Sequence, residues 1–130
     1  MSVLELNGRV FDASTTGTLT LTGEGSATTD VTQGLAKAWF NYNQSSGSES
    51  VQDSFNISSI SDDSTGVFTN SFSSNMSNAF WAGPMLSRNN RTQYNTDTGA
   101  SSGRAFRSAD SDNNAADQDS NTVACFGDLA

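Results

Sequence analysis

Hydrophobic and polar residues alternate along several short stretches of this chain, and a period of two is the spacing expected of β-strands. Residues 34–43 show it most clearly, with small and aromatic side chains at Ala36, Ala38, Phe40 and Tyr42. Thr, Val, Phe, Trp and Ser dominate the patterned stretches, and these residues favour strands over helices. The pattern predicts a strand here that ends at the turn-forming residues after it.

A second strand is predicted over residues 51–60, with Phe55 and Ile57 facing inward. The residues that follow, 61–66, carry Asp, Ser and Gly, which favour turns for different physical reasons. The two features together predict one half of a β-hairpin. This half is unusually polar, because most of the positions between its apolar residues are Ser, Asn and Asp.

The returning strand of this hairpin is predicted over residues 67–74, with Phe68 and Phe72 on one face. Asn70 lies between them on the same face. A polar side chain in that place requires a hydrogen-bond partner if the face is buried. We therefore expect Asn70 to be hydrogen-bonded inside the protein.

The pattern changes after the most apolar run, residues 78–86, in which Pro84 predicts an edge position or the end of a strand. Residues 87–122 have few apolar anchors and predict an irregular polar loop region. Strand character returns only at 121–129. Within that last strand, Cys125 is expected to be a buried, small apolar residue.

The elements together predict an all-β fold, an antiparallel β-sandwich or meander, because short strands follow one another with turn signals between them. Residues 1–33 are interpreted as an N-terminal arm with one short strand, where Leu19 and Leu21 alternate with Thr. Residues 34–130 are interpreted as the β-sandwich module.

Composition adds an expectation about assembly. Hydrophobic residues make up only 34 % of the chain, which is a thin supply for a small core. Burial against identical copies would provide the missing stabilisation. The net charge of −8 disfavours nucleic acid and anionic membranes as partners. There is no apolar run of about 18 residues that would span a bilayer.

Candidate catalytic groups are scarce. The chain has no His and a single Cys, which excludes triads and Cys–His pairs that depend on His, as well as Cys–His zinc clusters. Asp62 and Asp63 are adjacent, so on a strand their carboxylates would point to opposite faces. We therefore expect a protein that is not an enzyme.

Residues 110–119 contain a run of acidic side chains, and oxygen ligands at alternate positions suit Ca²⁺. The EF-hand pattern is not met, because Ala115 stands where Gly is needed and Asn121 where Glu is needed. A looser calcium site and a solvated surface loop remain the two interpretations. The candidate calcium ligands are Asp110, Asp112, Asp117 and Asp119.

The arginines and large aromatic residues are the candidate contacts within a trimer or with a partner. The arginines either pair with the acidic run, within or between subunits, or contact an acidic partner such as a capsid shell or a sialylated or sulfated glycan. The aromatic residues pack in a core or an interface, with sugar stacking by Trp81 as the alternative. These candidates are Trp39, Phe80, Trp81, Arg88, Arg91, Arg104 and Arg107.

Several segments together resemble one known module. The matching residues are Ala36, Lys37, Ala38, Trp39, Asn41, Ser54, Phe55, Asn56, Ile57, Ser58, Ser59, Ile60, Gly66, Phe68, Thr69, Phe72 and Met76. This pattern, over residues 34–86 and the last few residues, resembles a module that recurs in structural proteins of tailed bacteriophages, marine phages especially. The resemblance implies a trimeric, fibre-like or head-decorating protein.

The chain departs from that pattern at Asn70, which replaces an apolar residue, and over 87–122, which has no counterpart. The arm is also too short for a fibre shaft. We therefore expect a non-enzymatic virion protein on the outer surface of a phage particle, a homotrimeric short spike, fibre or head-decorating protein. Its expected partners are other capsid or tail proteins and a host surface glycan. The alternatives are the receptor-binding tip of a tail fibre and a carbohydrate-binding module outside a virion.

Overall fold

The computed structural model describes residues 3–6, 9–12, 20–22, 28–45, 47–88, 92–95 and 99–130. The chain divides into two compact units, Met1–Leu35 and Ala36–Ala130. We call the second unit the main module. The division falls close to the predicted boundary between an arm at 1–33 and a module at 34–130.

The first unit contains two antiparallel strand pairs and one helical turn. Strand β1 (Val3–Leu6) pairs with β2 (Arg9–Asp12), β3 (Thr20–Thr22) pairs with β4 (Thr28–Asp30), and α1 covers Val31–Gly34. The sequence predicted one short strand in this part of the chain, which corresponds to β3, whereas the described residues of this unit form four. Strands of three or four residues are too short to show a clear period of two, which explains the difference.

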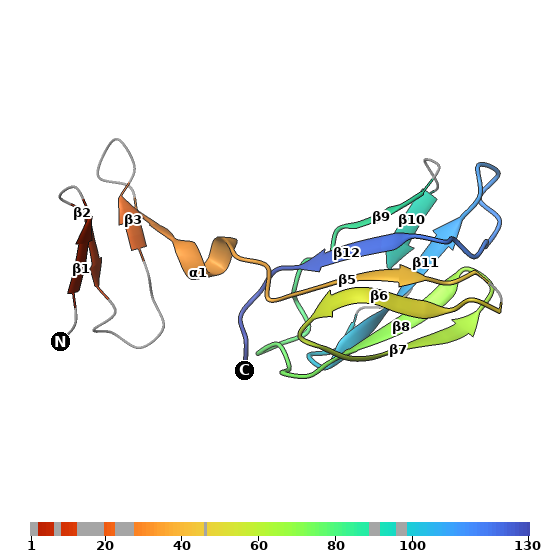
Figure 1. The fold of residues 1–130 in the computed structure, drawn as a ribbon, viewed down its shortest axis with the longest axis horizontal. Helices are drawn as coiled ribbons and strands as arrows, with labels where there is room; N and C mark the ends of the chain where they lie inside the picture. The colour runs from red at the N-terminus through yellow and green to blue at the C-terminus, as the bar shows by residue number, and fades with distance from the viewer. Residues whose placement is uncertain are drawn as a thin grey trace. The chain divides into compact units, whose positions relative to one another are not determined.

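Eight strands form the main module, and its described residues contain no helix. The strands are β5 (Ala38–Asn43), β6 (Ser50–Phe55), β7 (Ile57–Ser64), β8 (Val67–Phe72), β9 (Met85–Ser87), β10 (Thr92–Asn95), β11 (Gly103–Ala109) and β12 (Asn121–Cys125). One sheet has the order β6-β5-β12-β9 and the other the order β10-β11-β8-β7, and all neighbours are antiparallel (Figure 1). We call them the β5 sheet and the β8 sheet. The prediction of an all-β, antiparallel fold is confirmed.

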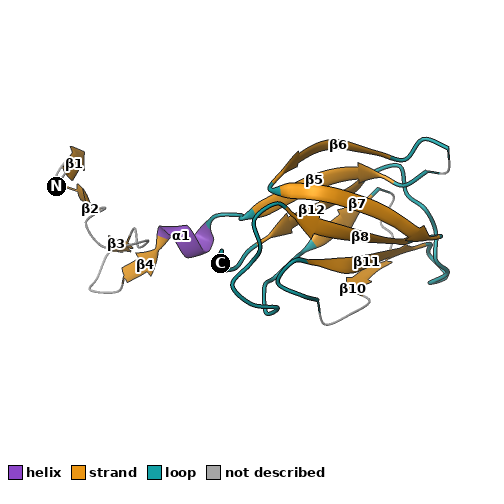
Figure 2. Ribbon diagram, turned by 90° about the horizontal axis from the view of Figure 1, so that it is seen from below, coloured by secondary structure: helices purple, strands orange, loops and turns teal. Residues whose placement is uncertain are grey.

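The β5 sheet and the β8 sheet form two layers (Figure 2). Side chains from both sheets form one aromatic core. The ring of Phe40 on β5 lies 6.1 Å, between centroids, from Phe68 on β8 and from Phe106 on β11. Both contacts have edge-to-face geometry, and each adds about 0.5–1.5 kcal/mol beyond simple burial. The polar hairpin predicted from the sequence therefore contributes Phe68 and Phe72 to a core within its own chain.

Two amide side chains inside this core are hydrogen-bonded. Oδ1 of Asn70 accepts the backbone N–H of Arg104 at 3.2 Å. Nε2 of Gln44 donates to Oδ1 of Asp62 at 2.9 Å and to the carbonyl oxygen of Val67 at 3.1 Å. Both side chains are fully buried. The expectation that Asn70 is buried with a hydrogen-bond partner is confirmed.

The chain passes from one sheet to the other at Asn56, which separates β6 from β7. This residue has a φ of 57°, a left-handed conformation that Asn tolerates better than most residues. Its side chain fixes the corner, since Nδ2 donates to the carbonyl oxygens of Lys37 and Ser74, and Oδ1 accepts the N–H of Ser74. Ile57 packs against the core as predicted, but the inward orientation predicted for Phe55 is wrong, because the corner interrupts the alternation and leaves Phe55 exposed.

The irregular loop predicted over residues 87–122 is also corrected. Strand β11 (Gly103–Ala109) lies inside the β8 sheet, between β8 and β10. Its buried alternate positions are Arg104, Phe106 and Ser108, of which only one is apolar. The sequence of β11 therefore lacks the alternation of apolar and polar residues that predicts a strand, although buried and less buried positions do alternate along Arg104–Ser108.

Pro84 has the position that the sequence predicts for it. Strand β9 begins directly after Pro84 and forms one edge of the β5 sheet. The carbonyl oxygen of Pro84 accepts the N–H of Ala124 at 3.2 Å. Because proline has no N–H to donate, the end of an edge strand suits it.

Candidate binding surfaces

The outer face of the β5 sheet carries a pair of exposed aromatic side chains. Trp39 on β5 and Phe55 on β6 are directly opposite each other in the strand register. Side chains in such a pair have Cβ atoms about 5 Å apart and lie on the same face of the sheet. Their exposed fractions are 38 % and 54 %. We call Trp39 and Phe55 the aromatic pair.

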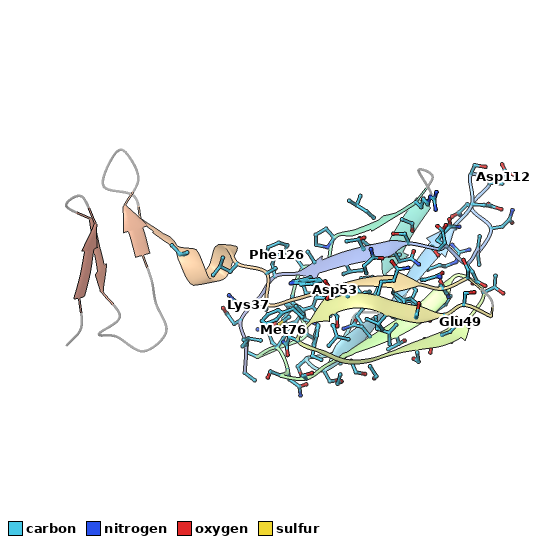
Figure 3. The ribbon with its side chains drawn as sticks, in the orientation of Figure 1. Lys37, Glu49, Asp53, Met76, Asp112 and Phe126 are labelled. Atoms are coloured by element: carbon cyan, nitrogen blue, oxygen red, sulfur yellow. The ribbon has the colours of Figure 1, made fainter. Side chains whose placement is uncertain are left out.

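Polar groups form the next row on the same face. Asn41 on β5 is opposite Asp53 on β6 and Thr122 on β12, and Figure 3 labels Asp53 on its strand. Oδ1 of Asn41 accepts a hydrogen bond from the hydroxyl of Ser120 at 3.3 Å. The row therefore offers an amide, a carboxylate and a hydroxyl about 7 Å along the strands from the aromatic pair.

A second exposed apolar feature lies at the end of the main module where Figure 3 labels Met76 and Phe126. Phe80 is 95 % exposed. Its backbone N–H donates to Oδ1 of Asn78, and the neighbouring N–H of Ala82 donates to the carbonyl oxygen of Phe126. Phe80 and Leu129 are the exposed large apolar residues of these segments, and we call them the end patch. An aromatic side chain is thus held on ordered backbone with almost no cover from its own chain.

Trp81 and Arg104 were among the candidate contacts within a trimer or with a partner, with core packing left open for Trp81 and pairing within the chain for Arg104. The structure buries both inside the main module. The indole Nε1–H of Trp81 donates to the carbonyl oxygen of Ala100 at 2.9 Å, and its ring packs against Phe72. The guanidinium of Arg104 lies over the indole ring and donates to the carbonyl oxygen of Ala79. Sugar stacking by Trp81 is excluded by this burial.

The other arginines have different surroundings. Arg88 forms an exposed ion pair with Asp119, with a distance of 2.5 Å between Nη1 and Oδ2, so this arginine does pair with the acidic run within its own chain. Arg107 donates from Nη2 to the carbonyl oxygen of Asn113 at 3.1 Å. Arg91 lies outside the described residues. Arg88 and Arg107 thus both contact the segment 110–119, whereas Arg104 is buried.

Three of the four candidate calcium ligands, Asp110, Asp117 and Asp119, have separate partners. Oδ1 of Asp110 accepts the N–H groups of Asp112 and Asn114, an arrangement that closes the loop on itself. Oδ1 of Asp117 accepts the N–H of Gly66, and Asp119 pairs with Arg88 as described. In the part of the chain that the structure describes, no three acidic, His or Cys residues converge as a metal site would require.

Comparison with protein-family models, with curated proteins and with solved structures found no match.

The main module has a surface cavity whose lining includes Asn70 and Arg104. This cavity of about 300 Å³ lies beside β8 and the turn at 99–103, and hydroxyl side chains and backbone line much of it, including Thr69, Ser71 and Ser102.

Cys125 is fully buried, as predicted, and this burial raises the pKa of its thiol to about 12. A thiol in that environment is a poor nucleophile.

No helix in the described residues is long and apolar enough to cross a membrane.

The sequence missed Phe55 as a surface residue and named Trp39 without its partner. The available signal was Asn56, since Asn is one of the few residues that readily adopts a positive φ and so marks a break in strand alternation. Trp39 faces outward because it alternates with the buried Ala38 and Phe40 on β5. The pairing of β5 with β6 brings Trp39 and Phe55 together, and a period of two within one strand does not reveal that pairing.

Proposed function

We propose that this protein is a non-enzymatic structural protein of a bacteriophage particle, exposed on the particle surface as a homotrimeric short spike, fibre or head-decorating protein built on a β-sandwich. Its partners are further copies of itself and other capsid or tail proteins. The resemblance of residues 34–86 to a tailed-phage module supports the location. The exposed Phe80 supports the assembly.

Phe80 is the observation that carries the proposal. Full burial of a phenylalanine side chain stabilises by about 1.5–3 kcal/mol, and Phe80 leaves nearly all of that unused within the described chain, at 95 % exposure. Aromatic residues held on ordered backbone are typical anchors of protein interfaces. The end patch adds Leu129, which is also exposed. This combination suits a module whose end contacts identical copies.

Charge supports a surface role over a role inside the particle. The chain carries 14 acidic and 6 basic residues, and packaged nucleic acid repels such a protein. Arg88 is already paired with Asp119, and Arg104 is buried. Two of the four arginines that were candidates to bind a sulfated or sialylated glycan therefore already have contacts within the chain.

The first experiment is the mass of the purified protein by light scattering. A trimer predicts about 41 kDa, three times the chain mass of 13.7 kDa. Phe80→Ser should convert the trimer to monomer. Val51→Ser, which changes another exposed apolar residue on β6, should leave the mass at that of the trimer. A wild-type protein that stays at the mass of one chain at every concentration contradicts the proposal.

The second experiment separates the two roles on a particle. For a head-decorating protein, particles that lack it should lose infectivity at lower temperature and internal pressure, with adsorption to cells unchanged. For a receptor-binding spike or fibre tip, adsorption alone should fall. If the loss of the protein changes neither property, the virion proposal is wrong.

A carbohydrate-binding module outside a virion is the second candidate. The sequence based it on Trp81, which is buried. The aromatic pair now supports it in place of Trp81, because Trp39 and Phe55 are neighbouring aromatic side chains that are both partly exposed to solvent. The two candidates differ in mass and in particle association, both of which the experiments above measure.

A further inference from the structure

We infer that the aromatic pair is a binding site for a neutral polysaccharide, a chain of hexopyranose units that stacks on Trp39 and Phe55. Nothing in this inference requires the proposed trimer, since the aromatic pair lies on the outer face of the β5 sheet and the end patch is formed by other residues. It assigns a ligand to a surface whose aromatic side chains are only partly covered by the main module's described residues.

The first argument is the rigidity of the site. β5 is an inner strand of its sheet, and β12 and β6 flank it on either side. The residues on either side of Trp39, Ala38 and Phe40, are fully buried. The backbone of Trp39 is therefore fixed by the core, and little conformational entropy is lost when a ligand stacks on its ring.

The second argument is chemical. The C–H faces of pyranose rings are apolar and their edges carry hydroxyls, so sugar sites combine aromatic faces with planar hydrogen-bonding groups. Asn41 and Asp53 form the next row on the same face as the aromatic pair. Their amide and carboxylate are placed to bond hydroxyls of a ring stacked on Trp39 or of the next ring along the strands.

The third argument is size, which separates a polysaccharide from a second copy of the chain. The exposed parts of Trp39 and Phe55, at 38 % and 54 %, amount to about 200 Å². A stable protein dimer needs about 800 Å² from each partner. About 57 % of such an interface is apolar, or about 450 Å² from each partner, and Trp39, Phe55 and Leu86 on β9 together expose less apolar area than that. One or two sugar rings need far less.

The fourth argument is charge. Asp53 lies beside the aromatic pair, and the chain as a whole has a net charge of −8. A polyanionic glycan would be repelled at this face. The ligand class is therefore a neutral chain, of unmodified hexoses or N-acetylated hexosamines.

The experiment is a titration of the full-length protein with cellohexaose, chitohexaose and maltohexaose, followed by tryptophan fluorescence and calorimetry. The chain has two Trp residues, and only Trp39 is solvent-exposed. Binding should shift the Trp39 emission for at least one of the three sugars. Trp39→Ala and Phe55→Ala should each weaken binding at least about tenfold. Ser61→Ala, at an exposed position on β7 in the other sheet, should bind like the wild-type protein.

Two controls keep the outcomes separate. The near-ultraviolet signal of the buried Trp81 should persist in Trp39→Ala, which shows that the module is still folded. Light scattering on the same variants should give the wild-type mass. The inference is overturned if none of the three sugars binds, if Trp39→Ala binds as the wild-type does, or if Trp39→Ala changes the mass, which would make a second copy the occupant. A failed trimer with intact sugar binding contradicts the proposed function alone.

Discussion

The guanidinium carbon of Arg104 lies 4.2 Å from the centre of the Trp81 indole ring, and both side chains are buried. Each also bonds a nearby carbonyl, Trp81 that of Ala100 and Arg104 that of Ala79. The stacked pair thus connects the segments around Ala79 and Ala100 to the aromatic core by hydrogen bonds. Two residues that look like surface contacts in the sequence are structural.

Arg104→Ala should lower the free energy of unfolding by about 2 kcal/mol, since a desolvated cation–π contact is lost. Arg88→Ala is the matched control, because it removes an exposed ion pair with Asp119 that contributes about 0–1 kcal/mol. Urea denaturation measures both. Equal losses in the two variants would show that the position of Arg104 over Trp81 adds nothing.

Asn56→Ala should destabilise the protein more than Asn56→Gly, by about 1 kcal/mol. Both variants lose the hydrogen bonds of the Asn56 side chain with Lys37 and Ser74. Only Ala adds the steric cost of a φ of 57°, which Gly avoids. The measurement is the urea midpoint at constant slope. If Gly is as damaging as Ala, the side-chain bonds alone hold the corner.

Gly66→Ala and Gly47→Ala together separate the cost of a steric clash at the new Cβ from the cost of an unfavourable backbone conformation. Both glycines have a positive φ, 69° and 75°, so Ala costs about 1 kcal/mol at either site. A Cβ at Gly66 would lie 2.5 Å from the backbone N of Ala116 and O of Ser108, whereas nothing lies within 4 Å at Gly47.

Gly66→Ala should therefore be the more damaging substitution, by about 1–3 kcal/mol. Thermal melts of the two variants side by side provide the measurement. Similar melting temperatures would mean that the loop at Ala116 moves aside without cost.

Cys125 should make stability depend on pH in the alkaline range. Burial raises the pKa of its thiol from 9.0 to about 12, so the folded chain keeps a proton that the unfolded chain releases. This contribution is fully present below pH 9 and is lost as the pH rises towards 12, with a slope of about 1.4 kcal/mol per pH unit. Urea denaturation between about pH 8 and pH 10.5 measures it.

Cys125→Ala is the control for that pH series. The pKa of Tyr42 is also raised, chiefly by burial, and its contribution remains in both proteins. The wild-type protein should therefore lose more stability than the variant over the same range. Parallel pH dependences in the two proteins would contradict the assignment to Cys125. The folded wild-type protein should also be unreactive towards a thiol reagent near neutral pH.

The sequence predicted the strands whose inward positions are apolar. Strand β5 is an example, since Ala38, Phe40 and Tyr42 are all buried. It missed β11, whose buried positions include Arg104 and Ser108. Arg104 is buried because it stacks on the Trp81 ring, and Ser108 is buried because its hydroxyl donates to the carbonyl oxygen of Ala116. Polar side chains of this kind can occupy core positions, so the period of apolar residues alone does not detect them.

The candidate sites were predicted less completely than the fold. Trp39 and Phe80 were chosen for residue type, and both are exposed. Trp81 has the same residue type as Trp39 and lies in the core, so type alone does not separate surface from interior. The pairing of Trp39 with Phe55 depends on the register of β5 and β6 and on the corner at Asn56. Both are properties of tertiary structure.

The corner at Asn56 also has a mechanical consequence. Only one residue separates the end of β6 from the start of β7, and these strands belong to different sheets. A pulling force on β6 is therefore transmitted to the second sheet through the backbone of Asn56. Sliding one sheet past the other would first require Asn56 to leave its left-handed conformation and to lose the hydrogen bonds of its side chain with Lys37 and Ser74.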